Sequence, residues 1–287
     1  MGLFSGMDKF GLGKYKDTSS IIEENKVTSA YNKVESEVNQ KTPEERESEV
    51  LFDKRFTCPV CDMSFVAKCV RAGKIKIVDK DMDLRPIYEF MDPLKYDVIA
   101  CDKCGYSSLS RYFGKLSSRQ MKTIHEQVGM SFRGLDSCTD DIYSYDYAIT
   151  RYKLALICSM VKQAKNGERA YTCLKLAWVI RGKRLTLDPQ SEEFKELYKD
   201  ELECVQNAYE GFVRAISSEQ FPIAGMDENT LKYILSDLAR RLKKHDEAIK
   251  LLGDVITSKT TNSRLKEEAL KLKEIIKEEV NKKSAFR

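Results

Sequence analysis

Four cysteines in two closely spaced pairs are the residues of this sequence that are best suited to chemistry. Cys58 and Cys61 form the first pair, and Cys101 and Cys104 form the second, with two residues between the members of each pair. This spacing lets both sulfurs of a tight turn point at one cation, and two such turns complete the tetrahedral set of thiolates that Zn²⁺ prefers. We therefore predict that these four residues bind a structural zinc ion.

Residues 62–100 separate the two pairs, and this interval is longer than the usual spacing of a short zinc ribbon. We expect several strands or a long hairpin within it. Two unrelated cysteine pairs, or redox-active pairs, are the alternatives. A redox Cys-x-x-Cys of the thioredoxin type opens a helix after a strand in a βαβ pattern, and neither pair lies in such a pattern.

Two further residues near the pairs are candidate ligands by type, but we expect Cys69 to be an ordinary buried residue and His125 to be a packing or surface residue. Cys69 lies between the pairs, and a free cysteine is usually a small buried residue. His125 follows the second pair beside an apolar stripe of Met121, Ile124 and Val128. A histidine ligand there would have to displace one of four well-spaced cysteines.

Local patterns around the cysteine pairs predict a short helix followed by strands. Residues 42–45 (Thr-Pro-Glu-Glu) are a good helix start, and we expect this helix to run to about Phe52. Alternating polar and apolar residues predict a half-buried strand over residues 74–78. Residues 65–67 and 96–100 have strand character as well.

From about residue 141 onward, apolar residues recur with a helical period, and each apolar face needs a partner helix. Residues 238–249 are similar to the turn of a tetratricopeptide repeat, in which the small Ala248 lets two helices approach closely, although Lys243 stands where the repeat prefers glycine. Ala170 is the corresponding small residue one helix pair earlier. The interval from Ala170 to Ala248 is not a multiple of the repeat length of about 34 residues, so we expect degenerate repeats. An irregular helical bundle is the alternative.

The first helix of this region is expected to bury one apolar face, which consists of Ala148, Tyr152, Ala155, Leu156 and Met160.

These patterns predict an α+β protein with three parts. Residues 1–42 are polar with scattered glycines, and we expect a flexible arm there. Residues 43–116 are expected to form a small β-rich, zinc-ribbon-like domain with four cysteine ligands. Residues 117–287 are expected to form an all-α, tetratricopeptide-like domain.

Composition narrows the class of protein further. The chain has 287 residues, of which 42% are hydrophobic, so it can bury a sizeable core. Its net charge of +4 is small and does not by itself indicate that the protein binds nucleic acid. Nine cysteines without a signal peptide or a long apolar run predict a reduced, cytoplasmic protein that does not enter a membrane.

Several segments together resemble one known family. They are the two cysteine turns, residues 84–86 (Leu-Arg-Pro), residues 92–98 (Asp-Pro-Leu-Lys-Tyr-Asp-Val) and residues 101–106 (Cys-Asp-Lys-Cys-Gly-Tyr). The similarity is to the bacterial cytoplasmic family called domain of unknown function 2225, and it covers about residues 50–260. The resemblance implies a zinc ribbon followed by tetratricopeptide-like helices, and it carries no assigned activity. Asp62 departs from the glycine that zinc knuckles often place after the second cysteine.

The sequence favours a non-enzymatic, zinc-stabilised scaffold or adaptor that binds a peptide or protein partner through its stacked helices. It contains no phosphate-binding glycine loop, no HExxH motif and no Gly-x-Ser-x-Gly elbow. A closed four-sulfur site leaves no position for a catalytic water. We therefore expect neither enzymatic activity nor a small-molecule substrate.

Two alternative functions depend on the cysteine-containing half. The first is a nucleic-acid-binding zinc ribbon, in which Phe56 and Phe65 would be available to stack on bases. The second is a redox or metal-responsive sensor that loses zinc when one cysteine is oxidised. The basic residues that suggest nucleic acid binding are Lys54, Arg55, Lys68, Arg71, Lys74 and Lys76.

Overall fold

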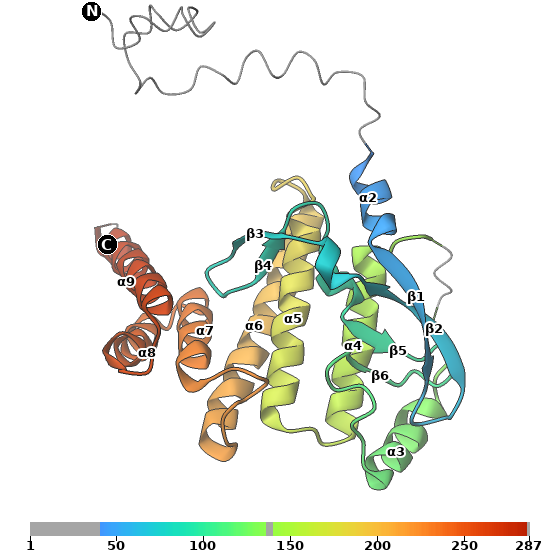
Figure 1. Ribbon diagram of the computed structural model, residues 1–287. Coiled ribbons are helices and arrows are strands. Elements are labelled where there is room, and N and C mark those ends of the chain that lie inside the picture. The colour runs from blue at the N-terminus through green and yellow to red at the C-terminus, as the bar shows by residue number, and fades with distance from the viewer. Residues whose placement is uncertain (1–40, 136–139, 286–287) are drawn as a thin grey trace, which may run out of the picture. The chain divides into compact units, whose positions relative to one another are not determined.

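A computed structural model of the chain describes residues 41–135 and 140–285 (Figure 1). The described residues from Pro43 onward belong to one compact unit. Short antiparallel strand pairs and the cysteine cluster occupy its N-terminal part, and helices follow, which confirms the predicted α+β class. The arm predicted at residues 1–42 lies outside the described residues, apart from its last two. The division at residue 116 stays a prediction.

The cysteine-containing half consists of three strand pairs and short helices. β1 pairs with β2, β3 pairs with β4, and β5 pairs with β6, all antiparallel. The elements in chain order are α2 (Pro43–Glu49), β1 (Leu51–Thr57), β2 (Ser64–Val70), η3 (Ala72–Lys74), β3 (Ile77–Lys80), β4 (Pro86–Tyr88), η4 (Pro93–Tyr96), β5 (Val98–Ala100) and β6 (Ser107–Leu109).

Three element boundaries predicted from the sequence are wrong. The first helix ends at Glu49 instead of Phe52, because Phe52 lies in β1 and pairs with Cys69 of β2. The strand predicted over residues 74–78 begins only at Ile77, because the 3-10 helix η3 precedes it. The strand predicted over residues 96–100 begins only at Val98, because the 3-10 helix η4 precedes it.

The second half of the described chain is helical. Side chains of Ser117, Ser191 and Asp227 accept hydrogen bonds from backbone N–H groups at the starts of three helices, as their positions in the sequence indicate. The elements are α3 (Ser118–Ile124), the π-helical turn η5 (His125–Gly129), α4 (Tyr145–Val161), α5 (Asn166–Arg184), α6 (Glu192–Ser218), α7 (Glu228–Arg241), α8 (His245–Thr257) and α9 (Ser263–Ala285).

Helices α4 to α9 form a stack in which each helix packs against the next one along the chain (Figure 1). The repeat-like turn joins α7 to α8. Lys243 adopts the left-handed conformation there with φ of 63°, which glycine adopts more easily, and Ala248 is fully buried in the core. Met160 does not lie on the buried face of α4 as predicted, because 63% of its surface is exposed.

A buried ionic cluster joins the loop between β3 and β4 to the helical stack. Arg181 of α5 donates to Asp83 of this loop over 2.6 Å and to Glu201 of α6 over 2.7 Å. Trp178 donates its indole N–H to Asp83 over 2.9 Å, and Arg241 of α7 contacts Glu201. The cluster therefore connects three helices to one loop of the cysteine-containing half.

The two carboxylates of this cluster are ionised because they are paired. Burial alone would raise the pKa of Asp83, but Arg181 and Arg241 together hold that pKa below its ordinary value. Burial also opposes ionisation of Glu201, and the same two arginines lower its pKa. Both side chains are fully buried, and a buried charge is tolerated only with such partners.

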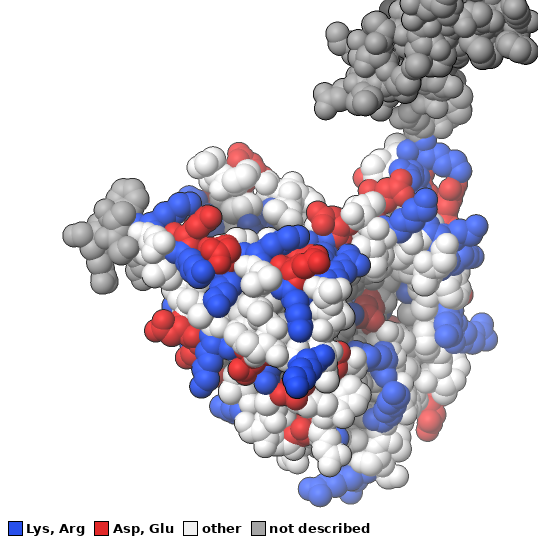
Figure 2. All heavy atoms as spheres, turned by 60° about the vertical axis from the view of Figure 1, so that its left-hand side comes forward, with Lys and Arg blue, Asp and Glu red and all other residues white. Residues whose placement is uncertain are grey.

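The surface of the C-terminal helices carries acidic and basic side chains side by side (Figure 2). Several form ion pairs, including Lys232 with Glu228 and Asp254, and Arg240 with Glu279. Mixed charge on this face agrees with the mild net charge of the chain. Among the described residues, every helix is too short or too polar to cross a membrane.

Candidate metal centre

The first cysteine pair lies in the turn that connects β1 to β2. The Asp62 N–H donates to the Cys58 carbonyl over 3.0 Å, and the Cys58 N–H donates to the Met63 carbonyl over 3.0 Å, so the turn is closed at both ends. The Val60 N–H lies 3.4 Å from the Cys58 sulfur. Asp62 adopts the left-handed conformation with φ of 57°, at the position where zinc knuckles often use glycine.

The second pair lies in the corresponding turn between β5 and β6. The Gly105 N–H donates to the Cys101 carbonyl over 3.0 Å, and the Cys101 N–H donates to the Tyr106 carbonyl over 2.8 Å. Gly105 has φ of 73°. A Cβ at this position would lie 2.6 Å from Cδ2 of Phe132, so both the backbone conformation and the packing require glycine here.

The two turns bring all four sulfurs together. Every pair of sulfurs lies within 4.8 Å, with 3.6 Å between Cys58 and Cys104 and 3.7 Å between Cys61 and Cys101. These separations exceed a disulfide bond of about 2.05 Å. A tetrahedron with Zn–S distances of about 2.3 Å has edges of about 3.8 Å, so the sulfur positions fit a four-coordinate metal ion.

The sulfur cluster is electrostatically costly without a cation. Hydrogen bonds from Cys104 and Cys58 lower the pKa of the Cys101 thiol, whereas the contact with Cys101 raises the pKa of Cys58. The pKa of Cys104 is raised as well, chiefly by the same neighbours. One thiolate is thus stabilised at the expense of its neighbours, and a divalent cation would favour the thiolate form of all four.

Aromatic side chains surround the cysteine turns. The rings of Phe56 and Phe65 stack with centroids 5.8 Å apart, and Phe113 packs edge-on against both. Phe65 is only 6% exposed. The sequence-based expectation that Phe65 is available to stack on bases is therefore wrong, because its ring belongs to the core beside the sulfur cluster, whereas Phe56 is half-buried and packs against that core. Five of the six basic residues are exposed, and Lys68 pairs with Asp53 over 3.6 Å.

One residue that contacts the centre was not expected from the sequence. Cys158 of α4 is buried, and its sulfur lies 3.4 Å from the Ser107 backbone nitrogen and 3.7 Å from the Gly105 carbonyl oxygen. It therefore packs α4 directly against the second cysteine turn. No sequence motif indicates that Cys158 contacts the cysteine turn, because it is one of many apolar residues on a predicted helix.

The two spare candidates for ligation lie outside the sulfur cluster. The four clustered cysteines include neither Cys69 nor His125. The Cys69 thiol contacts the Ala67 carbonyl, and His125 is an exposed residue at the start of η5. The exposed position of His125 agrees with the packing or surface role expected for it, whereas Cys69 is half-buried instead of fully buried.

Comparisons with known proteins agree with the resemblance seen in the sequence. A family model described as "Uncharacterized protein conserved in bacteria (DUF2225)" matches residues 51–279. The match includes all four clustered cysteines and the helices from α3 through most of α9, so it extends beyond the region expected from the sequence. A search of curated proteins and a search of solved structures gave no match. The chain belongs to this family of uncharacterised bacterial proteins.

Proposed function

We propose that this protein is a zinc-stabilised interaction module that binds a peptide or protein partner through its stacked helices and catalyses no reaction. Four sulfur ligands in a tetrahedral arrangement favour Zn²⁺ over the harder divalent ions. Such a ligand set leaves no coordination position for a reacting water. Bound zinc would supply folding free energy to the cysteine turns.

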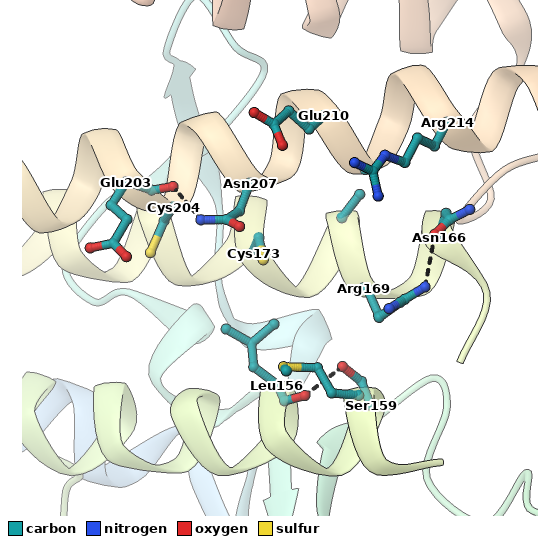
Figure 3. A pocket seen from close by; sticks show the side chains of 13 residues that line it. Leu156, Ser159, Asn166, Arg169, Cys173, Glu203, Cys204, Asn207, Glu210 and Arg214 are labelled. Atoms are coloured by element: carbon teal, nitrogen blue, oxygen red, sulfur yellow. Dashed lines mark hydrogen bonds between the residues drawn. The ribbon is translucent and has the colours of Figure 1, made fainter. Parts of the chain in front are cut away.

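The observation that supports a binding role most directly is a cavity of about 390 Å³ between α4, α5 and α6, called here the α4–α6 groove (Figure 3). Leu156, Met160, Ala170 and Cys173 contribute apolar lining. The large exposed surface of Met160 leaves a flexible apolar side chain without a partner helix. Concave apolar sites with a polar rim are typical of surfaces that bind peptides.

The metal centre supports the same helices that form the groove. Cys158 links the second cysteine turn to α4, and α4 supplies Leu156 and Met160 to the groove. A metal ion that fixes this turn would thereby fix the position of α4 against α5. We infer that partner binding depends on the metal even though the metal does not contact the partner.

The cysteines also support a cytoplasmic location as part of this proposal. All eight cysteines in the described part of the chain are free thiols, including the four that cluster. Thiols in this number persist in a reducing compartment. A reducing environment also preserves the thiolates that a metal site requires.

Affinity capture from the native bacterium tests the proposed function. The tagged full-length protein is used as purified and again after treatment with a strong zinc chelator, beside a tag-only control. We expect specific proteins to be enriched over the control and to be lost after chelation. Absence of any partner above the control would contradict the interaction role, and an enriched set unchanged by chelation would contradict its dependence on the metal.

A further inference from the structure

The two ends of the α4–α6 groove carry opposite charge (Figure 3). Arg169 of α5 and Arg214 of α6 line one end, and Glu203 of α6 lines the other. Glu210 of α6 lies between Glu203 and Arg214 along the helix and accepts a hydrogen bond from Gln206. The register of the two helices is fixed by close packing, because a Cβ at Gly211 would lie 2.8 Å from the Ala170 Cβ. The charge separation is therefore a fixed property of the groove.

The charges of Arg169, Arg214 and Glu203 lack ion-pair partners among the described residues. Arg169 donates to the neutral amide oxygen of Asn166 over 2.8 Å. In the described part of the chain, no carboxylate oxygen lies within 4.0 Å of the Arg169 or Arg214 side-chain nitrogens, and no basic nitrogen lies that close to the Glu203 carboxylate. Two adjacent guanidinium groups without an acidic partner are well suited to bind a carboxylate.

Between these ends, the side of the groove formed by α4 and α5 is apolar, whereas α6 contributes the exposed residues Asn207 and Glu210. Leu156 and Met160 of α4 and Cys173 of α5 supply the apolar lining, and Cys204 of α6 lies next to Glu203. Burial raises the pKa of Cys173 to about 11 and that of Cys204 to about 12, so both remain neutral thiols at physiological pH. A neutral buried cysteine behaves as a small apolar residue. This part of the groove is therefore suited to an aliphatic or aromatic side chain.

The length of the groove limits the size of its occupant. Glu203 and Arg214 are eleven positions apart on α6, which corresponds to about 16 Å along a helix. An extended peptide advances about 3.3 Å per residue, so about five residues span this distance. A segment of this length can place one side chain at each charged end and one in the apolar middle.

We propose that the α4–α6 groove binds a linear peptide segment with an apolar residue between a basic and an acidic residue. The acidic side chain lies between Arg169 and Arg214, the apolar side chain contacts Leu156 and Cys173, and the basic side chain pairs with Glu203. This inference rests on the proposed function, because it names the kind of partner that the interaction module recognises.

Selection from displayed random peptides tests this proposal with the full-length, zinc-loaded protein. One library holds each peptide inside a loop, and a second library presents free C-termini. We expect the loop library to enrich sequences with the basic, apolar and acidic order. A synthetic peptide of the enriched sequence should lose at least about tenfold in affinity when Arg169→Glu and Arg214→Glu are combined. Replacing its acidic residue with lysine should restore binding to that double variant.

The control variant is Arg119→Glu, which reverses an exposed arginine on α3 outside the groove and should leave the affinity unchanged. Circular dichroism of each variant verifies that the helices are intact. Enriched peptides without the charge order, enrichment of free C-termini only, or binding unchanged by the double variant would each overturn the groove proposal. Those results leave the interaction role standing if affinity capture still finds partners. Failure of both experiments removes the proposed function as well.

Discussion

At the scale of single residues, two backbone positions let the cysteine turns close around one point. Asp62 and Gly105 each follow the second cysteine of a pair, and both have positive φ. Spacing alone predicts that Cys58 and Cys61 share one turn, because a Cys-x-x-Cys turn is a local structure. The contact between Gly105 and Phe132 could not be predicted, because it depends on the path of the chain after the second turn.

Replacing Gly105 with alanine should destabilise the metal centre. Alanine at φ of 73° is strained, and its Cβ would press against the Phe132 ring. We expect the free energy of unfolding to fall by about 2–3 kcal/mol, and metal affinity to fall with it. Chemical denaturation and metal titration measure these two changes.

Gly114→Ala is the matched control for this substitution. Gly114 has a similar φ of 83°, but a Cβ there would meet no atom within 4 Å. We expect a loss of only about 1–2 kcal/mol and unchanged metal affinity. Equal losses for the two variants would show that packing of the second cysteine turn against Phe132 contributes nothing.

At the scale of elements, the helices were more predictable than their connections to the strands. The starts at Ser117, Ser191 and Asp227 follow from local capping chemistry, which the sequence displays directly. The pairing of Asp83 with Arg181 joins residues about a hundred positions apart, and no local pattern indicates it. Buried charges of this kind look like ordinary surface residues in the sequence.

Asp83→Asn should loosen the loop between β3 and β4 from the helical stack. The substitution removes the buried charge that pairs with Arg181, which keeps Asp81 and Glu201 as its partners. Because two partners remain, we expect the free energy of unfolding to fall by about 3 kcal/mol at neutral pH, the lower end of the range for a broken buried ion pair. Glu274→Gln, which removes an exposed ion pair with Lys277, is the control and should cost less than about 1 kcal/mol. Denaturant titration of both variants provides the comparison.

The same variant has a defined pH dependence. The pKa of Asp83 is lower in the folded protein than in the unfolded chain, where it has its ordinary value. The ionised side chain therefore contributes its full stabilisation at pH values above the unfolded-state pKa, and this contribution is lost as the pH falls toward the folded-state pKa. The difference between wild type and Asp83→Asn should therefore be constant between about pH 5 and 7 and should shrink below about pH 4. A difference that grows on acidification would contradict an ionised Asp83.

At the scale of the whole molecule, the cysteine cluster and the α4–α6 groove are joined through α4. The family match covers both, which is consistent with one unit that includes the strand pairs and the helices. The sequence could predict the two cysteine turns, whose sulfurs do cluster, and a helical stack, since both produce regular patterns. It could not predict where the stack is open, because the exposure of Met160 depends on the packing of three helices.

The most direct test of this account measures metal content and folding in the same purified protein. We expect one zinc ion per chain by elemental analysis, and we expect chelation to unfold the cysteine-containing half while most of the helical circular dichroism signal remains. Cys104→Ser should reproduce the chelated state without chelator. A wild-type protein that is metal-free yet unfolds cooperatively, or a Cys104→Ser variant with full zinc and full stability, would contradict the central claim.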